Sequence, residues 1–298
     1  MGKKYASEKI AKAIFILFAI IAIVAVCSIT VYMIKLGTPA LSQVGVVELL
    51  FGTEWKPTAA EPTFGIFCVI LTSIFGTMMA LLIGVPIGVL TAVFLAEVGN
   101  KKIVMIVQPA VELLAAVPSV IYGLLGIMLL KPFMYNLELM VYNDISEHQF
   151  TGGANFLSAI LVLAIMILPT VINISTSSIR AVQPSIKSAS LALGATKIQT
   201  IFKVVLPAAK SGIMTAVVLG MGRALGEAMA IAMVAGGAVN FPLPFNSVRF
   251  LTTLIVGEMS YSSGLHREAL FTIGLVLFAF ILFVNIFLTR MIRKGDAE

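Results

Sequence analysis

The sequence predicts an all-α polytopic membrane protein with six transmembrane helices and both termini in the cytoplasm. Three observations predict this class. Hydrophobic residues make up 59% of the 298 residues and charged residues only 11%, whereas charged residues reach about 25% in soluble domains. Apolar runs long enough to cross a bilayer recur along the chain, since about 20 such residues span the hydrocarbon core. Basic residues gather on one side of these runs.

The apolar runs define the elements of the predicted fold. They lie at roughly 13–34, 65–95, 104–131, 153–176, 211–236 and 268–289. No water is available in the hydrocarbon core, so each spanning segment must satisfy its own backbone hydrogen bonds and is expected to be helical. A transmembrane β-barrel would need short strands of alternating polarity, and the chain has no such pattern. The first run is too long for a signal-peptide core and is interpreted as a retained anchor.

The distribution of Lys and Arg predicts the orientation. With a cytoplasmic N-terminus, 14 of the 20 basic residues fall on the cytoplasmic side and five on the outer side, while Arg223 falls inside the membrane. Lys and Arg favour short cytoplasmic loops. The net charge of +6 is therefore explained by membrane topology, and it does not indicate a nucleic-acid partner.

Three outer loops are predicted, at about 35–64, 132–152 and 237–267. Trp55, the single tryptophan, is interpreted as an anchor at the membrane interface. The third loop is long, and its mildly apolar middle is expected to form a short helix along the outer surface. That helix would contact an external partner or cap a pore.

The sequence predicts no catalytic residue, metal site or cofactor. Cys27 and Cys68 lie in separate spans and are expected to be small buried apolar residues. His148 and His266 are predicted to lie in outer loops without ligand-like neighbours. No G-x-x-x-x-G-K-[ST] phosphate loop is present, so the chain is not expected to hydrolyse ATP in that manner.

The longest cytoplasmic interval contains the most informative pattern. Its two short helical segments are joined at Gly194, which is expected to take the left-handed conformation of a sharp turn. Ser188 and Ala189 precede the turn, and Leu206-Pro207 follows the second segment, where proline is expected to end the helix. An ordinary amphipathic helix at the interface is the alternative. The pattern favours a surface on which another protein exerts force.

The fifth span contains a charged pair at membrane depth. Arg223 and Glu227 are four residues apart, so on a continuous helix they would face the same way. A charge at that depth usually faces a partner or a water-filled path, and the guanidinium fork matches phosphate oxygens. Glu227 would then pair with Arg223 while the path is empty and moderate how tightly the anion is held. An ion pair that only pins the helix is the alternative, and the two interpretations are compatible because a resting pair can open. Gly222 and Gly226 form a small-residue face suited to close helix packing.

The third span contains a proline at its centre. Pro118 removes a helical hydrogen bond, and Ser119 beside it supplies a polar group. A tolerated kink and a role in gating are equally compatible with the pattern. Ser119 is therefore a candidate for the substrate pathway, and Pro118 a candidate for gating.

These motifs together resemble those of a known family. Ala189, Gly194, Leu206 and Pro207 match the spacing of the coupling segment in permeases of ABC importers, with Ser188 where that family usually has Glu. The stretches 112–123 and 222–227 resemble both permease subunits of phosphate-specific importers. The outer stretch 51–57 and the run 267–278 favour the PstC type. The chain is thus similar to PstC-type permease subunits of phosphate-specific ABC importers.

The resemblance implies a fold, partners and site residues. It implies a type I importer permease domain at 65–290 with a coupling segment at 185–207, preceded by an anchor helix and outer loop at 1–64 and followed by a tail at 291–298. The implied partners are a PstA-like permease, two cytoplasmic ATPase subunits and an extracytoplasmic phosphate-binding protein. Inorganic phosphate would pass Arg223 and Glu227 across the cytoplasmic membrane by alternating access, and the outside of the helices would contact membrane lipid.

Three alternatives remain open on the sequence. The first is a permease for another oxyanion, such as sulfate or molybdate. The second is a secondary transporter acting alone, which would predict inverted repeats or paired interrupted helices. The third is a membrane scaffold that reports phosphate status to a signalling kinase, and it is compatible with transport.

Overall fold

The computed structural model describes residues 2–142 and 148–295, with side chains described from 8 to 142 and from 148 to 290. The last residues of the predicted tail, 296–298, lie outside this part. The α-helices are α1 (Gly2–Val44), α2 (Val46–Phe51), α3 (Phe67–Val93), α4 (Lys101–Ala116), α5 (Ser119–Leu125), α6 (Lys131–Tyr142), α7 (Phe156–Arg180), α8 (Pro184–Ala192), α9 (Lys197–Thr200), α10 (Leu206–Ala208), α11 (Lys210–Leu225), α12 (Met229–Val234), α13 (Leu251–Glu258) and α14 (Gly264–Gly295).

Other regular structure is short. π-helical turns η1 (Phe94–Val98), η2 (Gly126–Leu130) and η3 (Ile201–Val205) continue α3, α5 and α9. Strands β1 (Trp55–Lys56) and β2 (Thr63–Phe64) form an antiparallel hairpin. Within the described residues the protein is thus almost wholly helical, which confirms the predicted all-α class.

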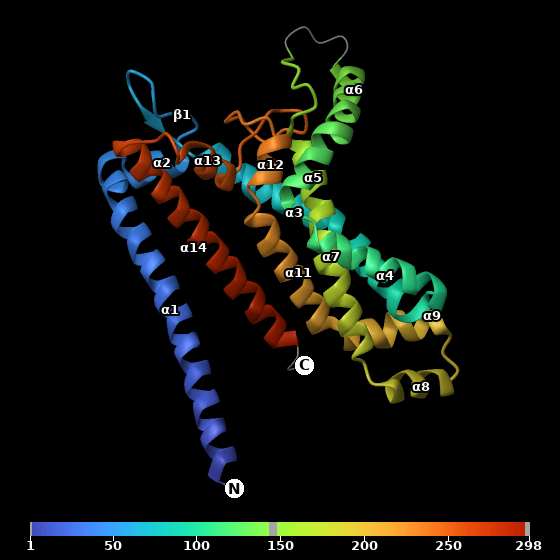
Figure 1. Ribbon diagram of the computed structural model, residues 1–298. Helices are drawn as coiled ribbons and strands as arrows, with labels where there is room; N and C mark the ends of the chain where they lie inside the picture. The colour runs from blue at the N-terminus through green and yellow to red at the C-terminus, as the bar shows by residue number, and fades with distance from the viewer. Residues whose placement is uncertain (1, 143–147, 296–298) are drawn as a thin grey trace.

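The helices long and apolar enough to cross a membrane agree with the predicted number of spans. Five are continuous: 8–44, 67–98, 119–142, 156–180 and 264–290. A sixth is formed if 197–208 and 210–225, which are bent by 68° relative to each other, count as one. Figure 1 shows both termini on the same side as α8 and α9, with β1, α2, α6 and α13 at the opposite, outer end.

The third span differs from the prediction. The expected run 104–131 is broken before Pro118, because proline has no N–H and forces the preceding residue into an extended conformation. Val117 accordingly has φ −67° and ψ 127° and ends α4. The spanning helix begins at Ser119 and runs to Tyr142, into the predicted outer loop.

The fifth span is also broken. The expected run 211–236 stops at Leu225, where Gly226 caps α11, and helical structure resumes at Met229. The predicted third outer loop contains α13, which confirms the expected short helix. The first predicted loop begins inside α1 and includes α2.

The core forms around α7, which packs along both α3 and α11. Small residues recur every four positions on one face of α3 and are buried: Gly76, Ala80, Gly84, Gly88 and Ala92. A Cβ on Gly84 or Gly88 would lie 2.7 Å from a side-chain atom of α7. These small residues therefore allow the two backbones to approach closely, which is how helices commonly associate in membranes.

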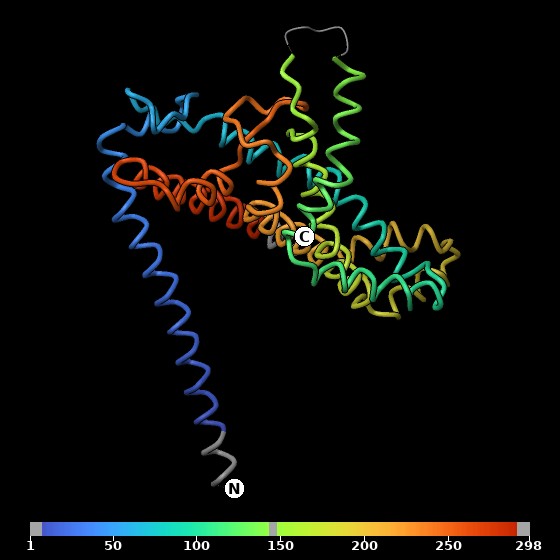
Figure 2. Tube along the Cα trace, turned by 45° about the horizontal axis from the view of Figure 1, so that its top comes forward, coloured from blue at the N-terminus to red at the C-terminus, as the bar shows by residue number. Residues whose placement is uncertain are grey.

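The N-terminal part of α1 stands apart from the other helices. Its most apolar window is 0% buried within the chain, and Figures 1 and 2 both show its N-terminal part leaving the remaining helices. Near its outer end α1 packs on α14, where the Thr272 hydroxyl donates to the Gly37 carbonyl at 2.7 Å. Cys27, predicted to be buried, is exposed on α1, whereas Cys68 on α3 is buried as expected.

Candidate functional site

Because the fifth span is broken, Arg223 and Glu227 do not lie on one continuous helix. Arg223 lies in the last turn of α11, whereas Glu227 follows the Gly226 cap. The Glu227 carboxylate accepts a hydrogen bond from the backbone N–H of Ala230 at 2.9 Å. This N–H belongs to the first turn of α12, where backbone donors lack partners within the helix and negative charge is favourable.

The predicted ion pair between these residues is therefore not formed. Four-residue spacing brings two side chains together only on a continuous helix, and the chain turns at Gly226. The ion pairs among the described residues do not include Arg223. The Arg223 guanidinium is thus free of a carboxylate partner within that part of the chain, while Glu227, 9% exposed, is committed to the backbone.

The break in the third span lies close to the break in the fifth. Helix α5 packs against α12, and a Cβ on Gly123 would lie 3.0 Å from the Ala230 Cα. The Tyr122 hydroxyl donates to the Leu114 carbonyl at 2.7 Å, across the break at Pro118. The fold thus brings together two interrupted spans that the sequence motifs singled out separately.

Ser119 and the two glycines occupy less constrained positions. Ser119 is partly exposed in the first turn of α5, directly after the exposed Pro118. A Cβ on Gly222 would meet no atom within 4 Å, and one on Gly226 would meet only the Gly222 carbonyl at 3.3 Å. No other helix of the described chain packs closely against these two glycines. Close helix packing at this face therefore stays a prediction, which would require a helix of another chain.

The cytoplasmic segment has the predicted turn. Gly194 has φ +88°, the left-handed conformation that glycine adopts without strain, so this prediction is confirmed. Helix α8 before it buries none of its residues, and Ser188 and Ala189 are exposed. Leu193, beside the turn, is 90% exposed. The segment therefore presents an apolar and small-residue surface to the cytoplasmic side.

Polar contacts attach this segment to the spans. Lys187 of α8 forms an ion pair with Glu97 of η1. The Ser190 and Thr200 hydroxyl oxygens lie 3.0 Å apart and join α8 to α9. Arg180, at the end of α7, donates to the Leu95 carbonyl at 3.2 Å. These contacts attach α8 to the cytoplasmic ends of α3 and α7.

Leu206 and Pro207 lie where the cytoplasmic helix ends. Pro207 cannot donate a backbone hydrogen bond, and the preceding turn, Ile201–Val205, is π-helical. The helix stops at Ala208, one residue beyond Pro207, before the 68° bend into α11. The predicted Leu-Pro stop is thus confirmed to within one residue, and the bend directs the chain from the cytoplasmic surface into the spans.

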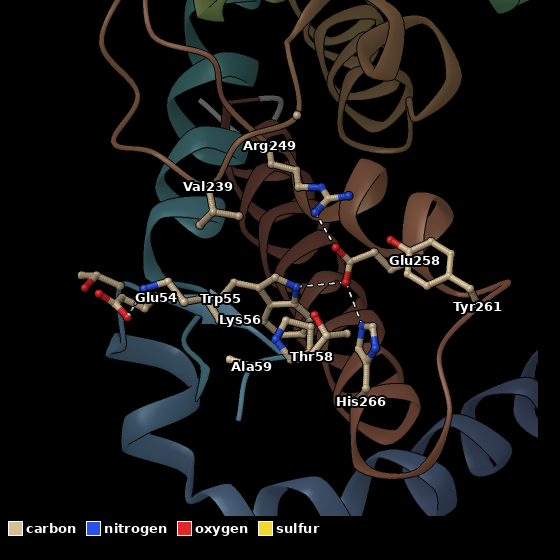
Figure 3. Close-up of a pocket in the computed structure, with 13 residues that line it drawn as sticks. Glu54, Trp55, Lys56, Thr58, Ala59, Val239, Arg249, Glu258, Tyr261 and His266 are labelled. Atoms are coloured by element: carbon tan, nitrogen blue, oxygen red, sulfur yellow. Dashed lines mark hydrogen bonds and ion pairs between the residues drawn. The ribbon is translucent and has the colours of Figure 1, made fainter. Parts of the chain in front are cut away.

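The structure also contains an outer polar pocket of about 660 Å³ that the sequence did not indicate. The Glu258 carboxylate at its wall accepts from Arg249 Nη1 at 2.5 Å, from Trp55 Nε1 at 3.0 Å and from His266 Nε2 at 2.8 Å. Figure 3 shows these three side chains converging on Glu258. The donors come from separate segments, which is why no local motif reveals the cluster.

Two predictions about these residues are wrong. Trp55, expected as an interfacial anchor, is 8% exposed and packs edge-on against Phe64 and His266. His266, expected in a loop, lies in the first turn of α14 and pairs with a carboxylate. His148 likewise pairs with Glu138 at 2.9 Å. In both cases long-range folding supplies partners that neighbouring sequence does not.

Relatives of known classification share most of the chain. A family model described as "Binding-protein-dependent transport system inner membrane component" matches residues 84–294. The chain is 37% identical over 282 residues to a probable ABC transporter permease protein, YqgH, of Bacillus subtilis, covering 91% of this chain and 88% of the relative. It is 34% identical over 286 residues to the phosphate transport system permease protein PstC of Xylella fastidiosa, covering 91% and 87%.

Solved structures share the fold. One is a bacterial alginate ABC transporter in complex with an alginate pentasaccharide-bound periplasmic protein, with a TM-score of 0.64, 18% identity and 94% of each chain covered. Another is an inward-facing MetNI methionine ABC transporter, with a TM-score of 0.54, 20% identity and coverage of 78% of this chain and 94% of the other. At sequence identities this low, the two solved structures show a shared fold and nothing about function. The matched model and the sequence relatives show that the chain belongs to the family of binding-protein-dependent transport system inner membrane components, as its motifs predict.

Proposed function

We propose that this chain is the PstC-type permease subunit of an ATP-driven importer and forms, with a PstA-like permease, the path of inorganic phosphate across the cytoplasmic membrane. The observation that carries the proposal is the guanidinium of Arg223 at the break between α11 and α12, which has no carboxylate partner among the described residues. A cation at that depth requires a partner or water. A planar guanidinium presents donors that fit two oxygens of a phosphate at once.

The partner permease completes the path. Helices α1 and α14 expose large apolar surfaces in this chain, and Gly222 and Gly226 leave space for close approach by another helix. A pseudo-symmetric pair would enclose the two broken spans between its subunits. Ser119 would then line the path beside Arg223, and the break at Pro118 would supply the flexible point of a gate.

ATP is hydrolysed by separate subunits in this proposal. Two cytoplasmic ATPase subunits dock on the pair, one of them on α8 and the turn at Gly194. Closure of the ATPases on ATP displaces α8, and the contacts of Lys187 and Arg180 carry the displacement to α3 and α7. An extracytoplasmic binding protein delivers phosphate at the outer end. The path opens first outward and then inward.

ATP hydrolysis by the reconstituted complex tests the substrate and the class together. The complex is supplied in turn with binding protein loaded with phosphate, sulfate or molybdate. Stimulation by phosphate alone is expected. Stimulation by another oxyanion would keep the importer class and overturn the substrate. If no ATPase assembles on this chain, the importer proposal fails and a transporter acting alone takes its place.

Substitution of Arg223 tests the role of the guanidinium. Arg223→Ala removes the cation, and Arg223→Lys keeps the charge but loses the fork. Lys12→Ala removes an exposed cation near the cytoplasmic end of α1 and serves as the matched control. Phosphate uptake should fall in the order wild type and Lys12→Ala, then Arg223→Lys, then Arg223→Ala.

A further inference from the structure

Helix α13 connects the outer pocket to the break in the fifth span. At its C-terminal end, Glu258 is 6% exposed and accepts the three hydrogen bonds described above. Its donors lie on β1, on the segment before α13 and on α14, so one carboxylate holds these outer elements together (Figure 3). A buried carboxylate with three donors is well compensated, and an amide in its place has only one acceptor oxygen, so at least one of these donors loses its acceptor.

The N-terminal end of α13 is attached to the break itself. The Thr252 hydroxyl donates to the Glu227 carbonyl at 2.6 Å, and Thr252 is 9% exposed. The Leu251 N–H donates to the Ser73 hydroxyl of α3 at 2.9 Å. Thus the residue whose side chain caps α12 has its backbone carbonyl bound by the first turn of α13.

The short helix between these ends is suited to act as one body. Eight residues of α-helix are about 12 Å long, and the apolar side of α13 is buried at Leu251 and Leu254, which are 2% and 0% exposed. Helix α13 also packs against α14 and α12. A short packed helix that is hydrogen-bonded at both ends moves with little internal deformation, and such elements carry coupling between sites.

We propose that Glu258 is a positioning residue, and that α13 transmits the state of the outer pocket to the Glu227 break. The pocket lies among the outer elements, and the hairpin that carries Trp55 forms part of its wall. Displacement of that hairpin by a partner docked at the outer end pulls on Glu258, and Thr252 passes the movement to the backbone beside Arg223. The direction of the signal rests on the importer function proposed above, whereas the mechanical link does not.

Hydrogen exchange of the assembled transporter in lipid nanodiscs tests the link. Glu258→Gln keeps the size of the side chain and removes its charge. Exchange is expected to rise in the outer pocket and also in peptides covering 226–232, because the cap of α12 loses its support. A merely local role for Glu258 predicts faster exchange around 53–59 and 258–266 with no change at 226–232, and that result overturns the proposal.

Glu138→Gln is the matched control. Glu138 is also an outer carboxylate, is 0% exposed, and accepts from His148 and from the Thr151 backbone and hydroxyl. It lies on α6 and has no contact with α13 in these hydrogen bonds. Its substitution is expected to leave exchange at 226–232 unchanged, and a rise there equal to that of Glu258→Gln would contradict a specific role for α13.

Thr252→Val breaks the opposite end of the link with little change in shape. It is expected to raise exchange at 226–232 without affecting 53–59. In the Glu258→Gln, Thr252→Val double variant the two effects should be less than additive, because both act through the same helix. Full additivity would overturn the proposal. These measurements do not depend on the substrate, so they separate failure of the link from failure of the phosphate assignment.

Discussion

The Glu227 carboxylate accepts from the backbone N–H of Ala230 and forms no ion pair with Arg223, although Arg223 and Glu227 are only four positions apart. The cause is the end of α11 at Leu225. The carboxylate therefore holds the start of α12, and the guanidinium is left for another partner. This division of roles distinguishes the charged pair from an ion pair that only pins a helix.

The first prediction separates the two charges. Arg223→Ala should abolish phosphate uptake while membrane insertion and complex assembly stay intact, because the guanidinium takes no part in the described ion pairs. Glu227→Gln should retain much of the uptake, because an amide oxygen still accepts from the Ala230 N–H. Glu227→Ala removes the acceptor and should destabilise the α12 start by about 1 kcal/mol. Uptake in membrane vesicles and thermal unfolding are the measurements.

Opposite results would contradict this assignment. Wild-type uptake by Arg223→Ala would remove Arg223 from the pathway. Equal loss of uptake in Glu227→Gln and Arg223→Ala would indicate that the charge of Glu227 is required, as an ion pair formed during transport would demand.

The second prediction concerns the turn at Gly194. The left-handed conformation costs a residue with a Cβ about 1–2 kcal/mol, and the cost is greater for a β-branched side chain. Gly194→Val should therefore shift the turn and lower the amount of substrate transported per ATP hydrolysed. Gly45→Val is the control, since Gly45 has φ +87° and equally open surroundings but lies between α1 and α2. If both variants transport the same amount of substrate per ATP hydrolysed, the turn at position 194 does not require glycine for coupling.

The third prediction concerns the ion pair of Lys187 with Glu97. It joins α8 to the end of α3 across 90 positions of sequence and is partly buried, with side chains 23% and 14% exposed. Lys187→Glu should repel Glu97 and reduce transport per ATP. The double reversal, with Glu97→Lys, should restore the pair and much of the coupling.

The exposed pair of Lys56 with Glu54 provides the control for this reversal. Its side chains are 62% and 60% exposed, and such surface pairs contribute little. Lys56→Glu should leave the amount of substrate transported per ATP at the wild-type value. Failure of the double reversal at 187 and 97 to restore coupling would show that the ion pair is not the route by which α8 acts.

The sequence predicted features that depend on neighbouring residues. Apolar runs revealed the spans because their length follows from bilayer thickness, and Gly194 revealed its turn because few other residues take that conformation. The break after Leu225 was missed, since glycines within an apolar run are common in membrane helices. The partners of Glu258 were missed because Trp55 lies 203 positions away, and only the folded chain brings them together.

The fourth prediction tests where the glycines of α11 pack. A Cβ on Gly212 would lie 2.1 Å from the Ser178 Oγ and 2.5 Å from its Cβ, so Gly212→Ala should destabilise the chain by about 1–3 kcal/mol through overpacking. Gly222→Ala meets no atom within 4 Å and should be neutral or slightly stabilising, since alanine favours the helix by about 1 kcal/mol. Thermal unfolding of the isolated subunit in detergent measures both.

A larger residue at 222 then tests contact with another chain. Gly222→Leu should leave the unfolding of the isolated subunit close to wild type, because the space beside it is open within this chain. It should weaken co-purification with the partner permease if that space is where a second helix approaches, since small residues permit such contact. Undiminished co-purification would place the partner elsewhere, and the exposed apolar faces of α1 and α14 would then be the surfaces through which the two permeases associate.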